Sequence, residues 1–373
     1  MLSRLTVSGY RSIKNLALPL SAVSVVLGAN GSGKSNLYRS LALIWSAAGG
    51  TLASSLAAEG GLASALWAGR RHKNEDDYIT LALELDDLSY ELVLGRVPFD
   101  SLMGMSYKES GGSLEQFNQF FLNDPDIKSE MVSVDYRGKQ IKLLERTSRN
   151  ISARNMDGRP IEYPLIVSSS ESVLTGLREP HLFPDLAKLR SDILSWRFYH
   201  HFRTDFQSPL REPQLSTFSP VLNDDGSNLF AALATIAAIE GSDLVRQAVA
   251  DAFPGTRLEF LLSDGLIEIE LHQPGLERPL HTAELSDGTL QYLALLAALL
   301  TPRPPGLLVL NEPETSVHAS LYGALARLIV RAAKHTQIFV TTHCAELAKQ
   351  VAAACKVEPI LLEKIDGATT TTR

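Results

Sequence analysis

The chain is poor in cysteine and has no excess of positive charge. Its two cysteines, Cys344 and Cys355, match neither the spacing of a metal-ligand pair nor a disulfide framework. We therefore expect a reducing, cytoplasmic environment. The formal net charge of −7 excludes a generally basic nucleic-acid-binding protein, so any contact with DNA or RNA would need a local basic patch.

Long hydrophobic runs and targeting signals are missing as well. The longest apolar candidate, Leu290–Leu300, is shorter than a membrane span, and the chain does not open on a charged stretch followed by an apolar one. We therefore expect no membrane partner. Internal repeats are absent, and the one low-complexity stretch is the tail Thr369–Thr372. At 373 residues the chain is long enough for one large domain or two, with a substantial core.

The most specific motif is a glycine-rich loop at residues 28–35. Its sequence, Gly28-Ala-Asn-Gly-Ser-Gly-Lys-Ser35, fits G-x-x-x-x-G-K-[ST], the pattern of a phosphate-binding P-loop. Glycines let backbone N–H groups turn toward phosphate oxygens. The apolar run Ser21–Leu27 predicts a buried strand before the loop, and helical spacing of leucines predicts a helix over Asn36–Ala47 after it.

Strand, loop and helix in this order favour a nucleotide site over a glycine-rich turn without a ligand. Lys34 would reach the β- and γ-phosphates, and the Ser35 hydroxyl would bind Mg²⁺. The predicted nucleotide-binding residues of this region are Gly28, Asn30, Gly31, Ser32, Gly33, Lys34, Ser35 and Asn36.

Two apolar runs near the C-terminus end in polar residues. Gly306–Asn311 is followed by Glu312-Pro-Glu314, and Ile338–Thr342 is followed by His343. Ligands bind at the carboxyl ends of parallel strands. Glu312 would then act as the general base for an attacking water, and His343 would hydrogen-bond a phosphate oxygen. The alternatives are a buried strand before a proline turn and an ordinary surface histidine.

A third motif, Leu285-Ser-Asp-Gly-Thr289, precedes the predicted helix Leu290–Leu300. A serine and backbone N–H groups at a helix N-terminus can bind an anion. The alternative is an ordinary N-cap.

In this order, the motifs resemble those of the ABC-type ATPase superfamily. Leu285–Thr289 is similar to its signature motif, Glu314–His318 to its D-loop, and His343 to its switch histidine. The resemblance implies ATP and Mg²⁺ as cofactors. It also implies a head-to-tail homodimer with each ATP between the P-loop of one chain and Ser286 and Gly288 of the other.

The opening, Leu5–Leu16, is similar to the start of RecF/SMC-type ATPase heads. Glu312–His318, Thr341–His343 and Asp225–Asn228 are most similar to stand-alone ATPases of the RecF-like and OLD-like group. In such heads Arg11 would approach the nucleotide; the alternative is a solvated loop arginine. Glu171 is the candidate for the glutamine-loop residue, which would contact the metal.

One position departs from this family pattern. Asn311 stands where an aspartate usually holds Mg²⁺, and an amide oxygen has no negative charge, so we expect weaker metal binding and slow hydrolysis. The predicted metal-site residues are Ser35, Asn311 and Glu171. A zinc-hook CxxC, a long heptad coiled coil and a Toprim-like nuclease domain are not present in the sequence.

Most of the chain separates Lys34 from Glu312, more than in a compact transporter ATPase. Two stretches of this region have nucleic-acid-like composition. Trp196–Arg203 with Ser208–Pro213 mixes aromatics and arginines, for which core packing with arginines tied to carboxylates is the favoured alternative. The second stretch is basic, and a solvated face is its favoured alternative. Its members are Arg137, Lys139, Lys142, Arg146, Arg149, Arg154 and Arg159.

The predicted fold is α/β, a P-loop NTPase of ABC/RecF-like type with a mixed and parallel sheet. A large α+β insertion would lie between the P-loop and the signature motif. The expected parts are 1–96 and 280–373, which form the ATPase head, and the insertion 97–279. The expected function is an ATP-hydrolysing, dimerising switch in DNA repair, DNA maintenance or phage defence. The alternative is a weakly hydrolysing subunit that regulates a partner nuclease or toxin.

Overall fold

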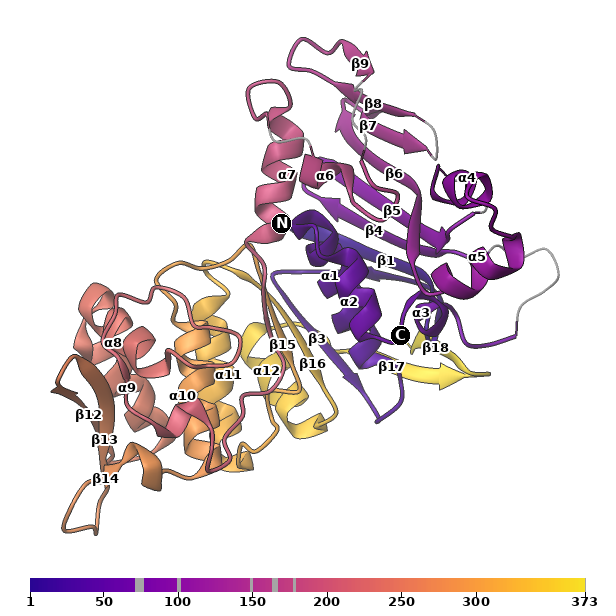
Figure 1. Ribbon diagram of the computed structural model, residues 1–373. Helices are drawn as coiled ribbons and strands as arrows, with labels where there is room; N and C mark the ends of the chain where they lie inside the picture. The colour runs from indigo at the N-terminus through magenta and orange to yellow at the C-terminus, as the bar shows by residue number, and fades with distance from the viewer. Residues whose placement is uncertain (71–76, 99–101, 148–149, 163–166, 177–178, 373) are drawn as a thin grey trace. The chain divides into compact units, whose positions relative to one another are not determined.

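The computed structural model describes residues 1–70, 77–98, 102–147, 150–162, 167–176 and 179–372. The chain forms two compact units, which Figure 1 shows by element and residue number. The first unit comprises Met1–Ser21, Ala29–Trp196 and Leu362–Arg373, and the second comprises Ala22–Gly28 and Arg197–Leu361. Within the described ranges, no helix combines the length and the apolar character needed to cross a membrane.

The first unit is built on an antiparallel sheet. Its strands lie in the order β2-β1-β4-β5-β6-β7-β8-β9. Buried residues alternate with less buried ones along β4, as in a strand with one face on a core. The bounds are β1 Leu2–Tyr10, β2 Ile13–Pro19, β4 Ile79–Leu85, β5 Leu88–Arg96, β6 Pro125–Tyr136, β7 Lys139–Thr147, β8 Ile151–Arg154 and β9 Pro160–Glu162.

The longest helix of the first unit, α1 (Lys34–Gly49), buries Leu37, Leu41 and Ile44, as their helical spacing predicts. The chain re-enters this unit within β17 (Ile360–Ile365) and ends in β18 (Ala368–Thr372). The other helices are α2 Leu52–Ala58, α3 Leu62–Ala65, α4 Leu102–Glu109, α5 Leu114–Phe121, α6 Val173–Gly176 and α7 Pro184–Leu194.

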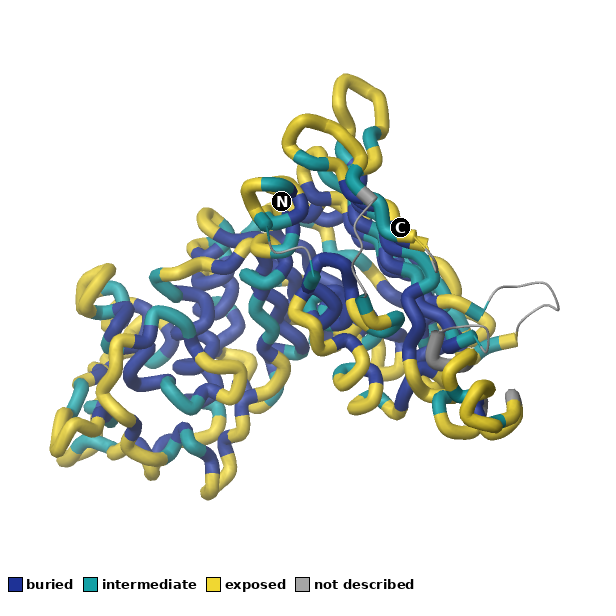
Figure 2. Tube along the Cα trace, turned by 45° about the horizontal axis from the view of Figure 1, so that its top comes forward, coloured by how far each residue is buried: buried dark blue, intermediate teal, exposed yellow. Residues whose placement is uncertain are grey.

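The second unit contains a parallel sheet. Its strands β10 (Arg197–Tyr199), β15 (Leu307–Asn311), β16 (Gln337–Thr342) and β3 (Val23–Gly28) lie side by side in that order. Every residue of β15 and β16 is buried, as expected of parallel strands covered on both faces. Figure 2 shows that each unit has a dark-blue interior and yellow outer loops.

Helices and a small antiparallel sheet complete the second unit. In that sheet, β12 (Arg257–Ser263) and β13 (Leu266–His272) form a hairpin, and β11 (Gln214–Leu215) and β14 (Leu280–His281) pair with β13. The helices are α8 Leu229–Glu240, α9 Ser242–Ala252, α10 Asp287–Leu299, α11 Tyr322–Ala332 and α12 Ala345–Cys355, with short 3₁₀ turns η1 Pro209–Arg211, η2 Thr282–Glu284 and η3 Ala319–Leu321.

One sequence-based prediction about local structure needs correction. The composition of Phe99–Asp126 predicts a flexible surface segment, but the described part of this segment contains α4, α5 and the start of β6. Its weak hydrophobic periodicity hid a capping box, in which Ser113 and Gln116 exchange hydrogen bonds at the start of α5. The low-complexity tail Thr369–Thr372 lies within strand β18.

Candidate functional site

The glycine-rich loop joins β3 to α1, so the predicted order of strand, loop and helix is confirmed. Gly31 (φ 81°) and Gly33 (φ 108°) have left-handed backbone conformations that side chains make costly. A Cβ added at Gly31 would have no heavy atom within 4 Å, whereas one at Gly33 would lie 2.1 Å from Thr369 Oγ1. Gly31 therefore borders open space, and Gly33 packs too closely to tolerate any other residue.

The start of α1 has the chemistry of an anion site. Its N-cap, Gly33, provides no side-chain hydrogen bond, and its first turn contains no acidic residue. Lys34 is 3% exposed, and its Nζ donates to the Ala29 carbonyl at 3.0 Å. Unlike Lys34, Ser35 is exposed, and the buried Ser32 Oγ has no hydrogen-bond partner among the described residues. A helix N-terminus, a lysine and hydroxyls fit the phosphates and the Mg²⁺ of a bound nucleotide.

In the second unit, the predicted residues Glu312 and His343 lie together. Asn311, the last residue of β15, is in register with Thr341 of β16, so both strands end at one edge of the sheet. Glu312 Oε2 is 3.7 Å from His343 Nδ1. The Glu312 N–H donates to the Thr341 carbonyl at 2.8 Å, and φ at Glu312 is 52°, which is uncommon for a residue other than glycine. Backbone strain of this kind is concentrated at functional sites.

Glu314 organises the same edge, although no separate role was predicted for it. Its side chain is buried, and Oε1 accepts hydrogen bonds from Thr342 Oγ1 at 2.6 Å, the His343 N–H at 2.9 Å and the Cys344 N–H at 3.3 Å. His343 Nδ1 is 3.1 Å from the same oxygen. Burial is the main cause that raises the pKa of the neighbouring Tyr322 to about 12, and a hydrogen bond with Cys344 is the next largest. Glu314 therefore holds both the backbone and the imidazole of His343.

The Asn311 side chain is already hydrogen-bonded within the second unit. Its Oδ1 accepts from Thr341 Oγ1 at 2.6 Å, and its Nδ2 lies 2.6 Å from Nδ1 of His200, which directly follows β10. Because an amide N–H can only donate, His200 Nδ1 is the acceptor in this pair. Sequence reasoning missed His200, since nothing local shows that β10 lies beside β15.

The motif at Leu285–Thr289 begins α10, with Ser286 as the N-cap. Ser286 Oγ accepts from the Thr289 N–H at 3.2 Å, so the cap expected from the sequence is present. A Cβ at Gly288 would lie 2.7 Å from the Ser316 carbonyl oxygen, which explains the glycine. This motif and the segment from Ser316 to His318 border one cavity of about 620 Å³. Ser286, Gly288, Thr289, Ser316 and His318 are among its lining residues.

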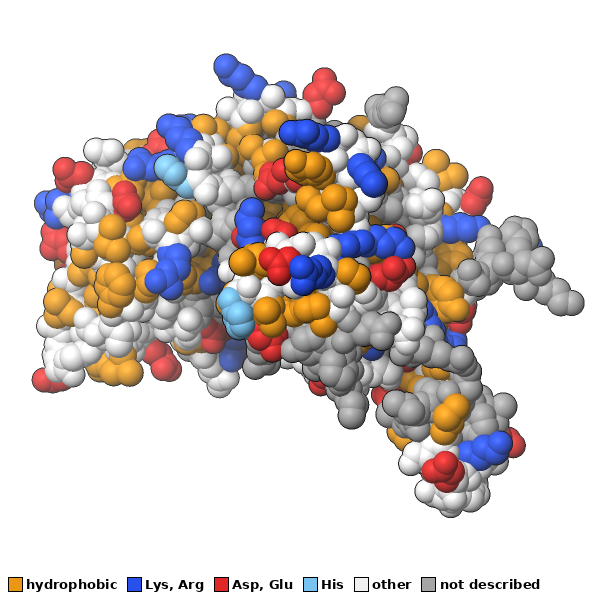
Figure 3. All heavy atoms as spheres, turned by 90° about the horizontal axis from the view of Figure 1, so that it is seen from above, with side chains coloured by type: hydrophobic (Ala, Val, Ile, Leu, Met, Phe, Trp, Pro, Cys, Tyr) orange, Lys and Arg blue, Asp and Glu red, His pale blue; other side chains and the backbone are white. Residues whose placement is uncertain are grey.

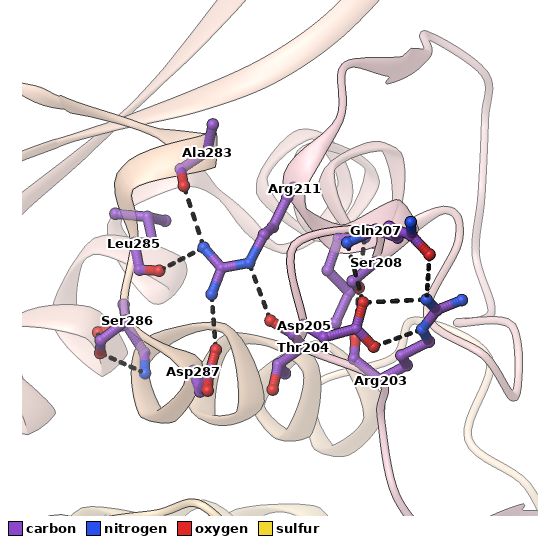
Figure 4. Close-up of polar contacts among 12 residues, drawn as sticks. Arg203, Thr204, Asp205, Gln207, Ser208, Arg211, Ala283, Leu285, Ser286 and Asp287 are labelled. Atoms are coloured by element: carbon purple, nitrogen blue, oxygen red, sulfur yellow. Dashed lines mark hydrogen bonds and ion pairs between the residues drawn. The ribbon is translucent and has the colours of Figure 1, made fainter.

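Arg211 fixes the backbone at the start of this motif (Figure 4). Its guanidinium is largely buried and donates to the carbonyls of Ala283 and Leu285, at 3.0 and 2.7 Å, and to Asp287 Oδ1 at 2.6 Å. Its Nε donates to the Thr204 carbonyl at 2.8 Å. A planar group with several fixed donors suits this task better than a lysine. The favoured alternative from the sequence was that arginines of this stretch pair with carboxylates, but the sequence did not show that Asp287 is the partner of Arg211.

The two remaining predicted site residues lie in the first unit, away from the motifs above in sequence. Arg11 forms an ion pair with Glu59, with Nη2 to Oε2 at 2.7 Å, so it is not a solvated arginine. Glu171 is exposed, and its carbonyl accepts a hydrogen bond from Arg146. Contacts of Arg11 with nucleotide and of Glu171 with metal remain predictions.

The aromatic stretch follows its structural alternative, which is core packing. In the first stretch Trp196, Tyr199 and Phe202 are buried in packed interiors, and Arg203 pairs with Asp205.

The described members of the basic stretch do not all face solvent. Arg146 is buried beside Glu130, Lys142 pairs with Glu145, and Arg149 lies outside the described residues. On the face in Figure 3, lysines and arginines are interspersed with acidic and hydrophobic side chains.

Comparisons with known proteins agree with this architecture. The family model described as "AAA domain, putative AbiEii toxin, Type IV TA system" matches residues 23–348, which is most of the chain. No curated protein matches the sequence.

Several solved SMC head domains share the fold at low sequence identity. The SMC head bound to the C-winged helix domain of ScpA is 16% identical, with a TM-score of 0.50 over 100% of this chain and 97% of that chain. The ScpA-bound head of Pyrococcus furiosus is 14% identical, with a TM-score of 0.50 over 100% of this chain and 95% of that chain. The head of Pyrococcus yayanosii, with a coiled coil and joint, is 12% identical, with a TM-score of 0.51 over 100% of this chain and 96% of that chain. The chain therefore belongs to this AAA-domain family, and its fold is that of an ABC/SMC-like P-loop ATPase.

Proposed function

We propose that this protein hydrolyses ATP and works as a switch that dimerises when ATP is bound. The observation that carries the proposal is a convergence of strand ends in the second unit. Thr342 of β16 is in register with Leu27 of β3, and Asn311 of β15 with Thr341. Gly28 is the last residue of β3, and Glu312 and His343 directly follow β15 and β16. The three residues therefore lie at the same edge of three neighbouring parallel strands, where α/β sheets bind ligands.

Each residue has a role that its chemistry supports. The N–H groups at the start of α1 and Lys34 would hold the phosphates, and Ser35 would contact Mg²⁺, which supplies positive charge to the β- and γ-phosphates. The Glu312 carboxylate would accept a proton from water as the water oxygen bonds to the γ-phosphorus. The bond from that phosphorus to the bridging oxygen then breaks, and ADP leaves with the electron pair. His343 would donate a hydrogen bond to the γ-phosphate.

The second half of the site would come from another copy of the chain. Ser286 and Gly288 at the N-terminus of α10 border an open cavity, which supports a role in binding an anion from outside. The direct test measures the molar mass of the unmodified protein in solution with and without MgATP, together with phosphate release. A doubling of mass with ATP and its reversal after hydrolysis support the switch, and an ATP-saturated monomer contradicts it.

Arg211 gives a specific test of the signature motif. Replacing Arg211 by alanine leaves the carbonyls of Ala283 and Leu285 without their donor, so we expect the ATP-dependent dimer to weaken by about tenfold or more. Nucleotide binding by the monomer should not change. Sedimentation at a series of protein concentrations measures the effect. Arg203→Ala is the matched control, because Arg203 pairs with Asp205 and not with the motif; equal weakening in both variants would contradict this role.

A second candidate function is a nucleotide-bound regulatory subunit that hydrolyses ATP very slowly. The observation that favours it is the neutral Asn311 amide, which is engaged by Thr341 and His200. Replacing Asn311 by aspartate adds a negative charge at this edge, which attracts Mg²⁺. We expect about tenfold less Mg²⁺ to be needed for half-maximal phosphate release, with a faster rate. A Mg²⁺ titration with unchanged midpoint and rate would show that Asn311 does not limit hydrolysis.

The biological setting rests on family resemblance. DNA repair, DNA maintenance and phage defence are the proposed settings for the switch, and control of a partner nuclease or toxin is the setting for the regulatory subunit. A DNA contact would need more than the basic stretch at residues 137–159, because its Arg146 is buried and its Lys142 is paired. A cytoplasmic location and the division into 1–96, 97–279 and 280–373 also remain proposals.

A further inference from the structure

The P-loop is connected to three other parts of the first unit by a chain of side-chain hydrogen bonds. Asn36 Nδ2 is 2.8 Å from Ser12 Oγ, between β1 and β2. Ser12 Oγ is 2.8 Å from Oγ1 of Thr369 in β18, and Thr369 Oγ1 is 2.8 Å from the Ser32 carbonyl oxygen in the P-loop. Thr369 is 1% exposed and its bond to the Ser32 carbonyl is buried, whereas Ser12 and Asn36 are partly exposed.

The direction of every bond in this chain follows from the donor and acceptor capacities. A carbonyl oxygen can only accept, so the one hydroxyl proton of Thr369 points to Ser32. Thr369 must then accept the proton of Ser12. Ser12 in turn accepts from the Asn36 amide, which can only donate through its nitrogen. The donors therefore all point the same way, from Asn36 through Ser12 and Thr369 to the Ser32 carbonyl. Hydrogen bonds aligned in this way strengthen one another.

The end of this chain lies at the most constrained part of the loop. Ser32 lies between Gly31 and Gly33, which both have positive φ. A bond to the Ser32 carbonyl restricts the rotation of the peptide between Ser32 and Gly33. The same threonine hydroxyl occupies the space where a side chain at residue 33 would lie. The backbone of β18 is also bound to the turn between β1 and β2, since the Thr369 N–H donates to the Ser12 carbonyl at 2.7 Å.

We propose that Thr369 is a positioning residue of the nucleotide site, and that strand β18 holds the P-loop in its phosphate-binding conformation before nucleotide arrives. This inference rests on the proposed ATP binding but not on dimerisation. A loop that is already ordered loses less conformational freedom on binding, which raises its affinity. Without the chain of hydrogen bonds, binding would have to order the loop, so affinity would fall while the chemical step would be little changed.

The test is the affinity of the full chain for MgATP and MgADP after Thr369→Val, which keeps the shape of the side chain and removes the hydroxyl. We expect binding about five- to tenfold weaker, the effect of one shielded hydrogen bond, with KM raised by a similar factor and kcat within about twofold. Ser12→Ala breaks the chain one bond earlier and should weaken binding in the same direction. Thr369→Ser keeps the hydroxyl and should restore affinity.

Thr370→Val is the matched control. Thr370 is the next residue of β18, on the opposite face, and its hydroxyl donates to the Glu363 carbonyl at 3.5 Å. If Thr369→Val does not fold, as judged by circular dichroism and melting, the comparison of Ser12→Ala with the unmodified chain decides.

The possible results separate this inference from the proposed function. Affinity within twofold of the unmodified chain in both Thr369→Val and Ser12→Ala overturns the inference and leaves the ATPase intact. An unmodified chain that binds neither MgATP nor MgADP overturns the proposed function, and the inference with it.

Discussion

Replacing Lys34 by alanine is expected to abolish ATP binding. Lys34 is buried at the start of α1, and the N-terminal turn of that helix has no acidic residue or side-chain cap to neutralise its positive potential. A lysine held there interacts with phosphate by a charge-assisted hydrogen bond, which is about twice as strong as a neutral one. Because the variant loses both this hydrogen bond and the long-range attraction between lysine and phosphate, we expect the affinity for ATP to fall by about 100-fold or more.

Titration calorimetry with MgATP measures this change directly. Lys349→Ala is the control, because Lys349 is an exposed lysine on α12 and its loss changes the net charge by the same amount. Melting curves of both variants should match that of the unmodified chain in the absence of nucleotide. A Lys34→Ala protein that binds ATP within threefold of the unmodified chain would place the nucleotide elsewhere.

Replacing Glu312 by glutamine is expected to block hydrolysis while leaving ATP binding intact, and so to trap the ATP-bound dimer. Glutamine has nearly the same shape as glutamate but cannot accept a proton from the attacking water. Loss of a general base lowers rates by about 10²- to 10⁴-fold. The unusual backbone conformation of Glu312 and its bond to the Thr341 carbonyl do not depend on the carboxylate, so the edge should keep its structure.

Single-turnover phosphate release and light scattering after gel filtration measure the two consequences. Glu358→Gln is the control, an exposed glutamate beyond α12. A Glu312→Gln protein that stays monomeric at saturating MgATP would contradict the dimer. One that still hydrolyses ATP at the unmodified rate would remove Glu312 as the base.

These two variants also separate the candidate functions. A switch that depends on hydrolysis should lose turnover in Glu312→Gln and gain a long-lived dimer. A regulatory subunit that scarcely hydrolyses ATP should show little difference between Glu312→Gln and the unmodified chain, although Lys34→Ala would still abolish nucleotide binding.

Several features of this protein could be predicted from local sequence. The P-loop, the strands that end at Asn311 and Thr342, and the turn between β12 and β13 were predictable because their patterns lie within a few residues. A strand that is buried on both faces is apolar throughout, and a two-residue turn with positive φ selects residues such as Asp264 and Gly265. The family fold follows from the same motifs in their order along the chain.

The polar partners were decided only by the tertiary structure. Arg211 and Asp287 are 76 positions apart, Asn311 and His200 are 111 apart, and Thr369 and Ser32 are 337 apart. A hydrogen bond depends on distance and direction to better than an ångström, and hydrophobic periodicity carries no such information. Local patterns therefore place each residue on a strand, helix or loop. Which donor meets which acceptor is settled by packing of the whole chain, and so a threonine of the C-terminal tail is hydrogen-bonded to the glycine-rich loop.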